Sequence, residues 1–112
     1  MTRYEKEDGT TPLQEFLNEL PVKHHAKALR DIDVLQKYGT ALTEPHVKHI
    51  SGKLWELRIK SASDISRIFY FIPIGKNIVL LHGFVKKTQK TSNREIEIAN
   101  NYLEDYQRRN KL

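Results

Sequence analysis

The chain has 112 residues, which is enough for one domain with a single hydrophobic core and too few for two. It contains no cysteine, which excludes disulfides, thiolate catalysis and cysteine-based zinc sites and suits a reducing compartment. The net charge of +5 is concentrated in residues 46–94, where ten Lys or Arg face two carboxylates. This segregation favours a polyanionic partner such as nucleic acid, although a generally basic, well-solvated surface is the alternative.

The N-terminus has no apolar stretch that resembles a signal peptide, and the longest apolar runs are too short to span a bilayer. We therefore expect a cytoplasmic protein without a membrane partner, folded as a single domain over residues 1–112.

Helical signals dominate the first 40 residues, after a short strand expected over residues 2–5. Thr11 as N-cap, Pro12 at the first helical position and Gln14 as capping-box partner predict one helix start. Pro21 is expected to open a second helix and Gly39 to end it. The apolar stripe of this second helix comprises Val22, Ala26, Leu29, Ile32 and Leu35, with Ala28 and Tyr38 beside it.

Two adjacent histidines, His24 and His25, fall on the second helix. Neighbouring helical residues point about 100 degrees apart, so the pair cannot share a metal, and both are expected at the surface. Residues 40–52 are expected to form a loop. His46 and His49 in this loop are candidates for acid–base chemistry, but no further ligands at suitable spacing support a metal site or another cofactor.

Three strands are predicted over residues 54–60, 65–72 and 77–85. In the first, alternation places Trp55, Leu57 and Ile59 on a core face and Glu56, Arg58 and Lys60 on a charged face. The second is apolar on both faces beyond Arg67 and is therefore expected to be central in the sheet. A hydrophobic, mainly antiparallel sheet with charge at one end follows from this pattern.

The turn between the first two strands determines their register. If it is symmetric about Ala62 and Ser63, Arg67 lies directly across from Arg58. Opposed like charges destabilise a sheet, so the pair favours a bound anion, although Glu56 could neutralise the two arginines equally well.

The third strand runs into the basic segment that contains Lys86, Lys87 and Lys90. Ser92 and Glu95 fit a capping box, and the apolar spacing that follows predicts an amphipathic helix ending near Gln107. Within the third strand, His82 is expected to be a satisfied core histidine or a catalytic group. Phe84 and Trp55 could stack on nucleic-acid bases, with a core position favoured for Trp55.

Several long strings of this sequence resemble the phage-derived Gp49-like branch of the RelE/HigB toxin superfamily: residues 46–48, 54–59, 67–70, 80–84 and 86–91. The resemblance implies an α+β, RelE-like fold in which two N-terminal helices pack on a small twisted, mainly antiparallel sheet of three to four strands, with a C-terminal helix. It also implies the toxin of a type II toxin–antitoxin module, a ribosome-dependent endoribonuclease that cuts mRNA without a metal. The implied partners are the ribosome with its mRNA, a HigA-like helix-turn-helix antitoxin and, through the antitoxin complex, operator DNA.

The resemblance also assigns roles to residues. Arg58 and Arg67 match the basic strand positions that clamp the scissile phosphate, and one of Lys86 and Lys87 would stabilise charge while the other contacts the RNA backbone. The acid–base candidates are Glu56, His82, His46 and His49, and Glu56 is equally well explained as a salt-bridge partner. The remaining RNA-binding candidates are Lys48, Lys53, Lys60, Phe84 and Lys90.

Two alternatives remain open at this stage. One is a module on the same scaffold that binds nucleic acid without cutting it, which would not require two arginines so close together. The other is a phage-derived regulatory protein that binds a host protein, which would not require a neighbouring helix-turn-helix gene.

Overall fold

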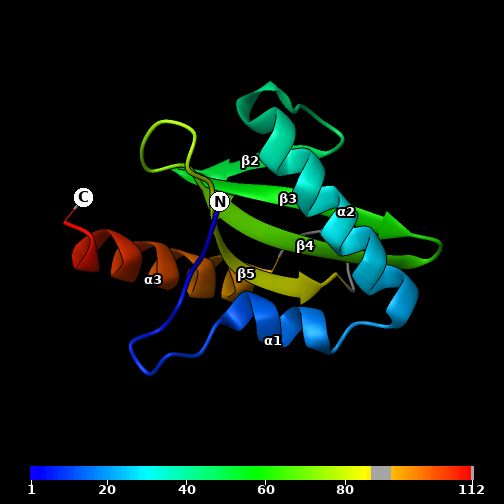
Figure 1. The fold of residues 1–112 in the computed structure, drawn as a ribbon, viewed down its shortest axis with the longest axis horizontal. Helices are drawn as coiled ribbons and strands as arrows, with labels where there is room; N and C mark the ends of the chain where they lie inside the picture. Colours follow the sequence, from blue (N-terminus) through cyan, green and yellow to red (C-terminus); the bar gives the residue numbers. More distant parts are fainter. Residues whose placement is uncertain (87–91, 112) are drawn as a thin grey trace.

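The computed structural model describes residues 1–86 and 92–111. Its elements follow in the order β1 (Thr2–Arg3), α1 (Pro12–Asn18), α2 (Val22–Tyr38), the 3-10 helix η1 (Gly39–Ala41), β2 (Val47–Ser51), β3 (Leu54–Ser61), β4 (Asp64–Phe71), β5 (Val79–Val85) and α3 (Asn93–Arg109) (Figure 1). The strands form one sheet in the order β1-β5-β4-β3-β2, antiparallel except for the β1–β5 pair. The α+β class, the mainly antiparallel sheet and the central position of β4 are confirmed.

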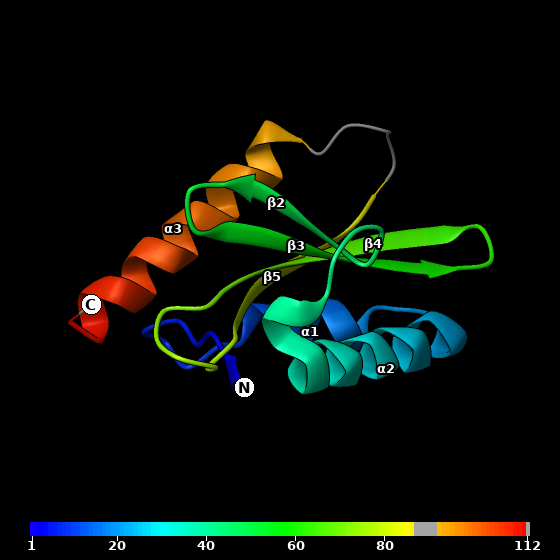
Figure 2. The ribbon, with the colours of Figure 1, turned by 90° about the horizontal axis from the view of Figure 1, so that it is seen from above.

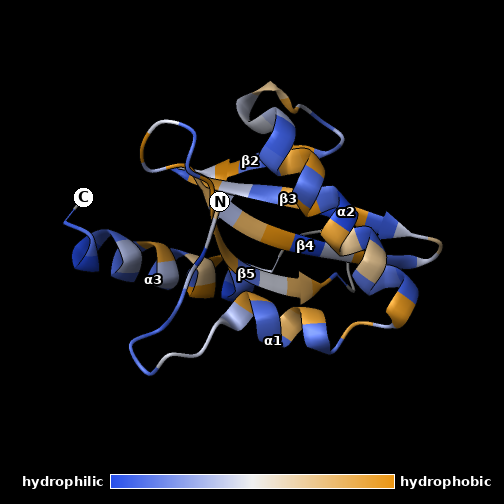
Figure 3. Ribbon diagram, viewed as in Figure 1, coloured by the Kyte–Doolittle hydropathy of each residue, from blue (hydrophilic) through white to orange (hydrophobic). Residues whose placement is uncertain are grey.

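The helices form layers on both faces of the sheet. Figure 2 shows α1 and α2 on one face and α3 on the other. Leu57, Ile59, Ile68 and Leu80 pack under α1 and α2, whereas Phe69, Phe71, Val79 and Leu81 pack under α3. Over much of their length the central strands β4 and β5 therefore carry apolar residues on both faces, and Figure 3 shows orange stretches in both, interrupted by polar positions.

The sheet has five strands rather than the three to four expected. The additional strand β2 lies within residues 40–52, where a loop was expected, so that part of the prediction was wrong. Residues 47–51 show little alternation of apolar and polar side chains, and only Val47 among them is buried. Their strand conformation is instead fixed by hydrogen-bonded pairing with β3. The short N-terminal strand is confirmed as β1, over two residues rather than four.

Helix α2 is rotated relative to the predicted stripe. Its buried residues are His24, Ala28, Ile32 and Leu35, whereas Val22 and Leu29 are exposed. His24 is 2% exposed and its Nε2 lies 2.7 Å from Ser66 Oγ on β4, so the surface position expected for it was wrong. Burial of the imidazole is tolerated because this hydrogen bond satisfies one ring nitrogen.

The helix ends agree closely with the sequence signals. Thr11 is the N-cap of α1, although its side chain makes no capping hydrogen bond, and Gly39 ends α2 with a positive φ of 52°. Ser92 caps α3 by accepting a hydrogen bond from the Arg94 backbone N–H, while Glu95 contacts His82 instead of closing the capping box. Tyr4, next to β1, donates a 2.5 Å hydrogen bond to Asp105, which ties the N-terminal strand to α3.

The β3–β4 hairpin has the predicted register. Ser61 pairs with Asp64 across a two-residue turn, and Arg58 lies directly opposite Arg67. The charged face of β3 is nevertheless not solvent-exposed throughout, because Glu56 is 1% exposed. The core position favoured for Trp55 was also wrong: the side chain is 38% exposed on the α2 side of the sheet.

Candidate functional site

The charged residues of the β3–β4 hairpin form a compact cluster on the face that also carries α3. Arg67 Nε lies 3.0 Å from Glu56 Oε1, and Arg58 Nε lies 3.6 Å from the same oxygen. Arg67 is buried, whereas the Arg58 side chain is 28% exposed. One carboxylate therefore holds two guanidinium groups in place and leaves the outer one accessible.

Two lysines extend this cluster on either side. Lys48 is exposed on β2, at the register position opposite Glu56 of β3. Lys86 directly follows β5, and its backbone N–H donates a hydrogen bond to the Ile65 carbonyl of β4. Burial lowers the pKa of the Lys86 ammonium, and the positive charges of Arg67, Arg58 and Lys48 lower it further, against the opposing effect of Glu56. The Lys86 ammonium is therefore close enough to all four of these charged side chains to interact with them electrostatically.

Burial likewise lowers the pKa of the Arg67 guanidinium, and the positive charge of Arg58 lowers it further, while Glu56 raises it.

The group that we call the hairpin cluster comprises Lys48, Glu56, Arg58, Arg67 and Lys86. Four cations there face one carboxylate, so the cluster carries excess positive charge. A phosphate can relieve that excess, because a planar guanidinium can donate to two of its oxygens at once.

An aromatic surface adjoins the hairpin cluster along β5. Phe84 occupies the register position opposite Arg67 of β4. Its ring stacks against that of Phe69, with 5.3 Å between the ring centroids. His82 lies beside Phe84 at 6.2 Å between ring centroids, and its Nε2 is 3.1 Å from Glu95 Oε2. His82 is partnered, as a core histidine would be, but is only half-buried. Cations beside accessible aromatic rings are the usual means of holding single-stranded RNA.

Four other predicted site residues are not members of the hairpin cluster. His49 and Lys53 are on the opposite side of the sheet, where the His49 ring lies 5.0 Å from that of Trp55 and its Nε2 contacts the Gly52 carbonyl. The exposed His46 precedes β2, and its carbonyl accepts a hydrogen bond from the Arg58 backbone N–H. Lys60 is exposed near the hairpin turn. His49 and Lys53 are therefore not brought to the arginine pair, whereas His46 and Lys60 lie beside Arg58 in the sheet.

Lys87 and Lys90 lie outside the described residues, so their assignments stay predictions. Within residues 1–86 and 92–111, no group of three or more His, Asp or Glu side chains is placed to hold a metal ion. The same residues include no helix with the length and hydrophobicity needed to cross a membrane.

Sequence reasoning missed the support behind Arg67. Ser66, the neighbouring residue on β4, is fully buried and bonded to His24 on α2, and the Ser66 carbonyl accepts a 3.1 Å hydrogen bond from Arg67 Nη1. The signal for this contact is the four-residue spacing of His24, Ala28 and Ile32, which continues one helical face. The arginine is therefore anchored from both sides of the sheet.

A comparison with protein-family models matches residues 15–104 to the family described as phage-derived protein Gp49-like. This match spans most of the chain and includes all five residues of the hairpin cluster. A search of curated proteins found no match.

Proposed function

This chain belongs to the phage-derived Gp49-like family, and on that premise we propose that it is the toxin of a type II toxin–antitoxin module. Its activity is cleavage of mRNA in the ribosomal A site, by a HigB-type, RelE-like endoribonuclease domain that acts in the cytoplasm. Support comes from the family, whose relationship to the HigB-type toxins the sequence resemblance indicates, and from the chemistry of the hairpin cluster.

The observation that carries the proposal is the opposed pair Arg58 and Arg67. Two guanidinium groups at one cross-strand position repel each other, and the structure supports this arrangement with one buried carboxylate. Uniform binding of an RNA backbone would be served by dispersed lysines. Two arginines directed at one point suit a single phosphate whose charge increases during the reaction.

The reaction is an attack by a ribose 2′-hydroxyl on the adjacent phosphorus. The 2′-hydroxyl gives up its proton to a solvent water as the new O–P bond closes a 2′,3′-cyclic phosphate. The bond to the 5′-oxygen breaks, and that oxygen takes up a proton and leaves as a 5′-hydroxyl. Arg58 and Arg67 stabilise the negative charge of the phosphorane, and Lys86, with its lowered pKa, supplies positive charge and a proton beside the leaving oxygen. Glu56 positions the two arginines, and Phe84 offers a ring on which a neighbouring base stacks.

The partners follow from this proposal. A HigA-like helix-turn-helix antitoxin neutralises the toxin, and the complex of the two contacts operator DNA through the antitoxin. The charge excess of residues 46–94 suits both the ribosome with its mRNA and an acidic neutralising segment.

The test is induced expression in bacteria of the wild type, Arg58→Ala and Arg30→Ala. Arg58 is preferred to Arg67 because it is partly exposed, so that its loss disturbs packing less. Arg30 is a matched control, since it is an exposed arginine on α2, on the other face of the sheet. Growth is followed, and mRNA ends are mapped by primer extension.

We expect growth arrest with cuts inside translated codons for the wild type and Arg30→Ala, and neither effect for Arg58→Ala at equal protein level. Normal growth with intact messages in all three strains would overturn the proposal and favour a protein that binds nucleic acid without cutting it.

A further inference from the structure

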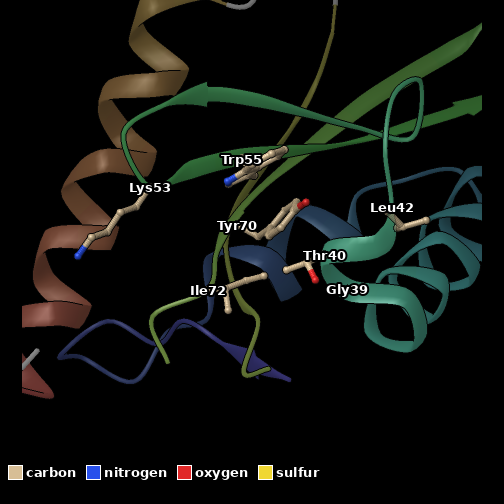
Figure 4. Close-up of a pocket in the computed structure, with 7 residues that line it drawn as sticks. All are labelled: Gly39, Thr40, Leu42, Lys53, Trp55, Tyr70 and Ile72. Carbon is tan, nitrogen blue, oxygen red and sulfur yellow. The ribbon is translucent and has the colours of Figure 1, made fainter. Parts of the chain in front are cut away.

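The sheet carries a second candidate site on the face opposite the hairpin cluster. A cavity of about 390 Å³ lies between η1 and the ends of β3 and β4, and it is lined by Gly39, Thr40, Leu42, Lys53, Trp55, Tyr70 and Ile72 (Figure 4). Small-ligand sites typically range from roughly 300 to 1,000 Å³ and combine apolar walls with a few polar groups. The cavity matches this description in both size and lining.

The polar group inside is the hydroxyl of Tyr70. This residue is 3% exposed, and no hydrogen bond joins its hydroxyl to any residue in the described part of the chain. Desolvation raises its pKa to about 12, so the phenol keeps its proton at physiological pH. Because Tyr70 lines the cavity, this hydroxyl is a donor available to a ligand acceptor.

The aromatic wall is Trp55, the cross-strand neighbour of Tyr70. This residue is 38% exposed, and on one side its ring contacts that of His49. An indole held in a half-open cavity provides a flat surface on which a planar ring can stack.

The charged group is Lys53, at the rim of the cavity. Figure 4 shows its side chain running outward from the lining residues, so that its ammonium is outside the cavity. A ligand with its planar part inside and an anionic group at the entrance would match both positions. Lys53 also belongs to the segment of residues 46–94 that carries the excess positive charge.

We propose that this cavity binds a nucleotide, with the base stacked on Trp55 and hydrogen-bonded to the Tyr70 hydroxyl, and with the phosphate at Lys53. The ligand is a free nucleoside phosphate or a single nucleotide of RNA, which present the same base and phosphate. The site goes beyond the cleavage reaction and does not depend on it, because the sheet separates the cavity from Arg58 and Arg67.

An aromatic anchor from an acidic protein segment is the competing occupant. The polar groups favour the nucleotide, because an apolar side chain brings no acceptor of its own to the Tyr70 hydroxyl, whereas every base carries acceptors on its edge.

Trp55 is the single tryptophan of the chain, so its fluorescence reports the cavity directly. The purified protein is titrated with the four nucleoside 5′-monophosphates, a short single-stranded oligoribonucleotide and an N-acetylated Glu-Phe dipeptide. Free N-acetyltryptophanamide corrects for light absorbed by the bases. The variants are Tyr70→Phe, which removes only the hydroxyl, Lys53→Gln, and Lys23→Gln as a control at an exposed lysine of α2.

We expect at least one nucleotide to change the Trp55 emission saturably. Tyr70→Phe should weaken binding about threefold to tenfold, and Lys53→Gln about twofold to fivefold. Lys23→Gln should bind as the wild type does, and so should Lys86→Gln, which alters the hairpin cluster. A tighter response to the oligoribonucleotide than to each monophosphate would identify RNA as the source of the nucleotide.

Three results would overturn the assignment: no saturable response to any nucleotide from folded protein, a response unchanged by Tyr70→Phe and Lys53→Gln, or tighter binding of the dipeptide. Because Lys86→Gln reports the opposite face, loss of cleavage with an intact Trp55 response separates this site from the proposed nuclease site.

Discussion

Arg58 on β3 and Arg67 on β4 occupy opposite positions on one face of the sheet and contact the same oxygen, Glu56 Oε1, at 3.6 and 3.0 Å. The carboxylate lies deeper than either guanidinium, at 1% exposure. It therefore holds the pair together from below and leaves the outer surface positively charged. The proposed function assigns this pair to the scissile phosphate, with Glu56 as the group that keeps both arginines in position.

The stability of the hairpin depends on Glu56. In Glu56→Gln, two guanidinium groups lose their carboxylate, and Arg67 stays buried without its ion pair. Breaking a buried pair from one side is strongly destabilising, so we expect the free energy of unfolding to fall by about 3 kcal/mol. Urea unfolding followed by circular dichroism measures this change. Glu97→Gln, an exposed position on α3, should stay within about 0.5 kcal/mol of the wild type, and equal effects of the two variants would contradict the account.

The ammonium of Lys86 should lose its proton at lower pH than an ordinary lysine. Burial and the nearby cations lower its pKa below 10.5, and Lys48 is one of these cations. We expect Lys48→Gln to move the pKa of Lys86 upward, as measured by NMR of the labelled lysine side chain. A downward or absent change would show that Lys48 is not part of the cluster.

The sign of the stability effect follows from the same shift. Between the lowered pKa of Lys86 and 10.5 the unfolded chain binds more protons than the folded one, so this group makes folding more favourable as pH rises through that range. RNA binding that relies on the ammonium should weaken over the same range. Lys86→Gln should remove both dependences, and their persistence in the variant would assign them to another group.

Two tyrosines should make the protein sensitive to alkali. Desolvation raises the pKa of Tyr4, with a further contribution from its hydrogen bond to Asp105, and desolvation raises that of Tyr70; both reach about 12 from 10.0. The folded state keeps these protons where the unfolded state loses them, so the free energy of unfolding should fall as pH rises from 10 to 12. Denaturation at a series of pH values measures the slope. Tyr4→Phe and Tyr70→Phe should each reduce it, and an unchanged slope would contradict the burial of these hydroxyls.

The contact between His24 and Ser66 should couple α2 to the strand that carries Arg67. Their side chains lie 2.7 Å apart in the core, so removal of either one leaves a buried polar group without its partner. We expect His24→Ala and Ser66→Ala each to cost about 1–3 kcal/mol of stability. A double-mutant cycle should give a coupling of at least about 0.5 kcal/mol, whereas additive effects would show that the hydrogen bond contributes nothing.

The arginine pair could be located from the sequence because the hairpin fixes it. Strand alternation assigned the face, and a two-residue turn at Ala62 and Ser63 set the register, so both residues were placed without tertiary information. The open choice between a bound anion and Glu56 as the partner depended on burial, which alternation does not reveal. The structure shows that Glu56 is buried and in contact with both arginines.

Other features were beyond the reach of sequence patterns because tertiary contacts decide them. Strand β2 has weak alternation and is ordered by its pairing with β3. Val22 fits an apolar stripe but is 86% exposed at the start of α2. The polar His24 is buried, with its side chain hydrogen-bonded to Ser66. Trp55 alternates with core residues, yet η1 leaves a cavity beside it instead of covering it.

The most direct test of the central claim is the chemistry of the cleaved ends. Purified protein is incubated with ribosomes that carry a defined mRNA, and the ends of the fragments are analysed for the wild type, Arg58→Ala and Arg30→Ala. We expect the wild type and Arg30→Ala to leave a 2′,3′-cyclic phosphate on one fragment and a 5′-hydroxyl on the other, and Arg58→Ala to leave the mRNA intact. Intact mRNA in every reaction, or fragments with 3′-hydroxyl and 5′-phosphate ends, would contradict the claim.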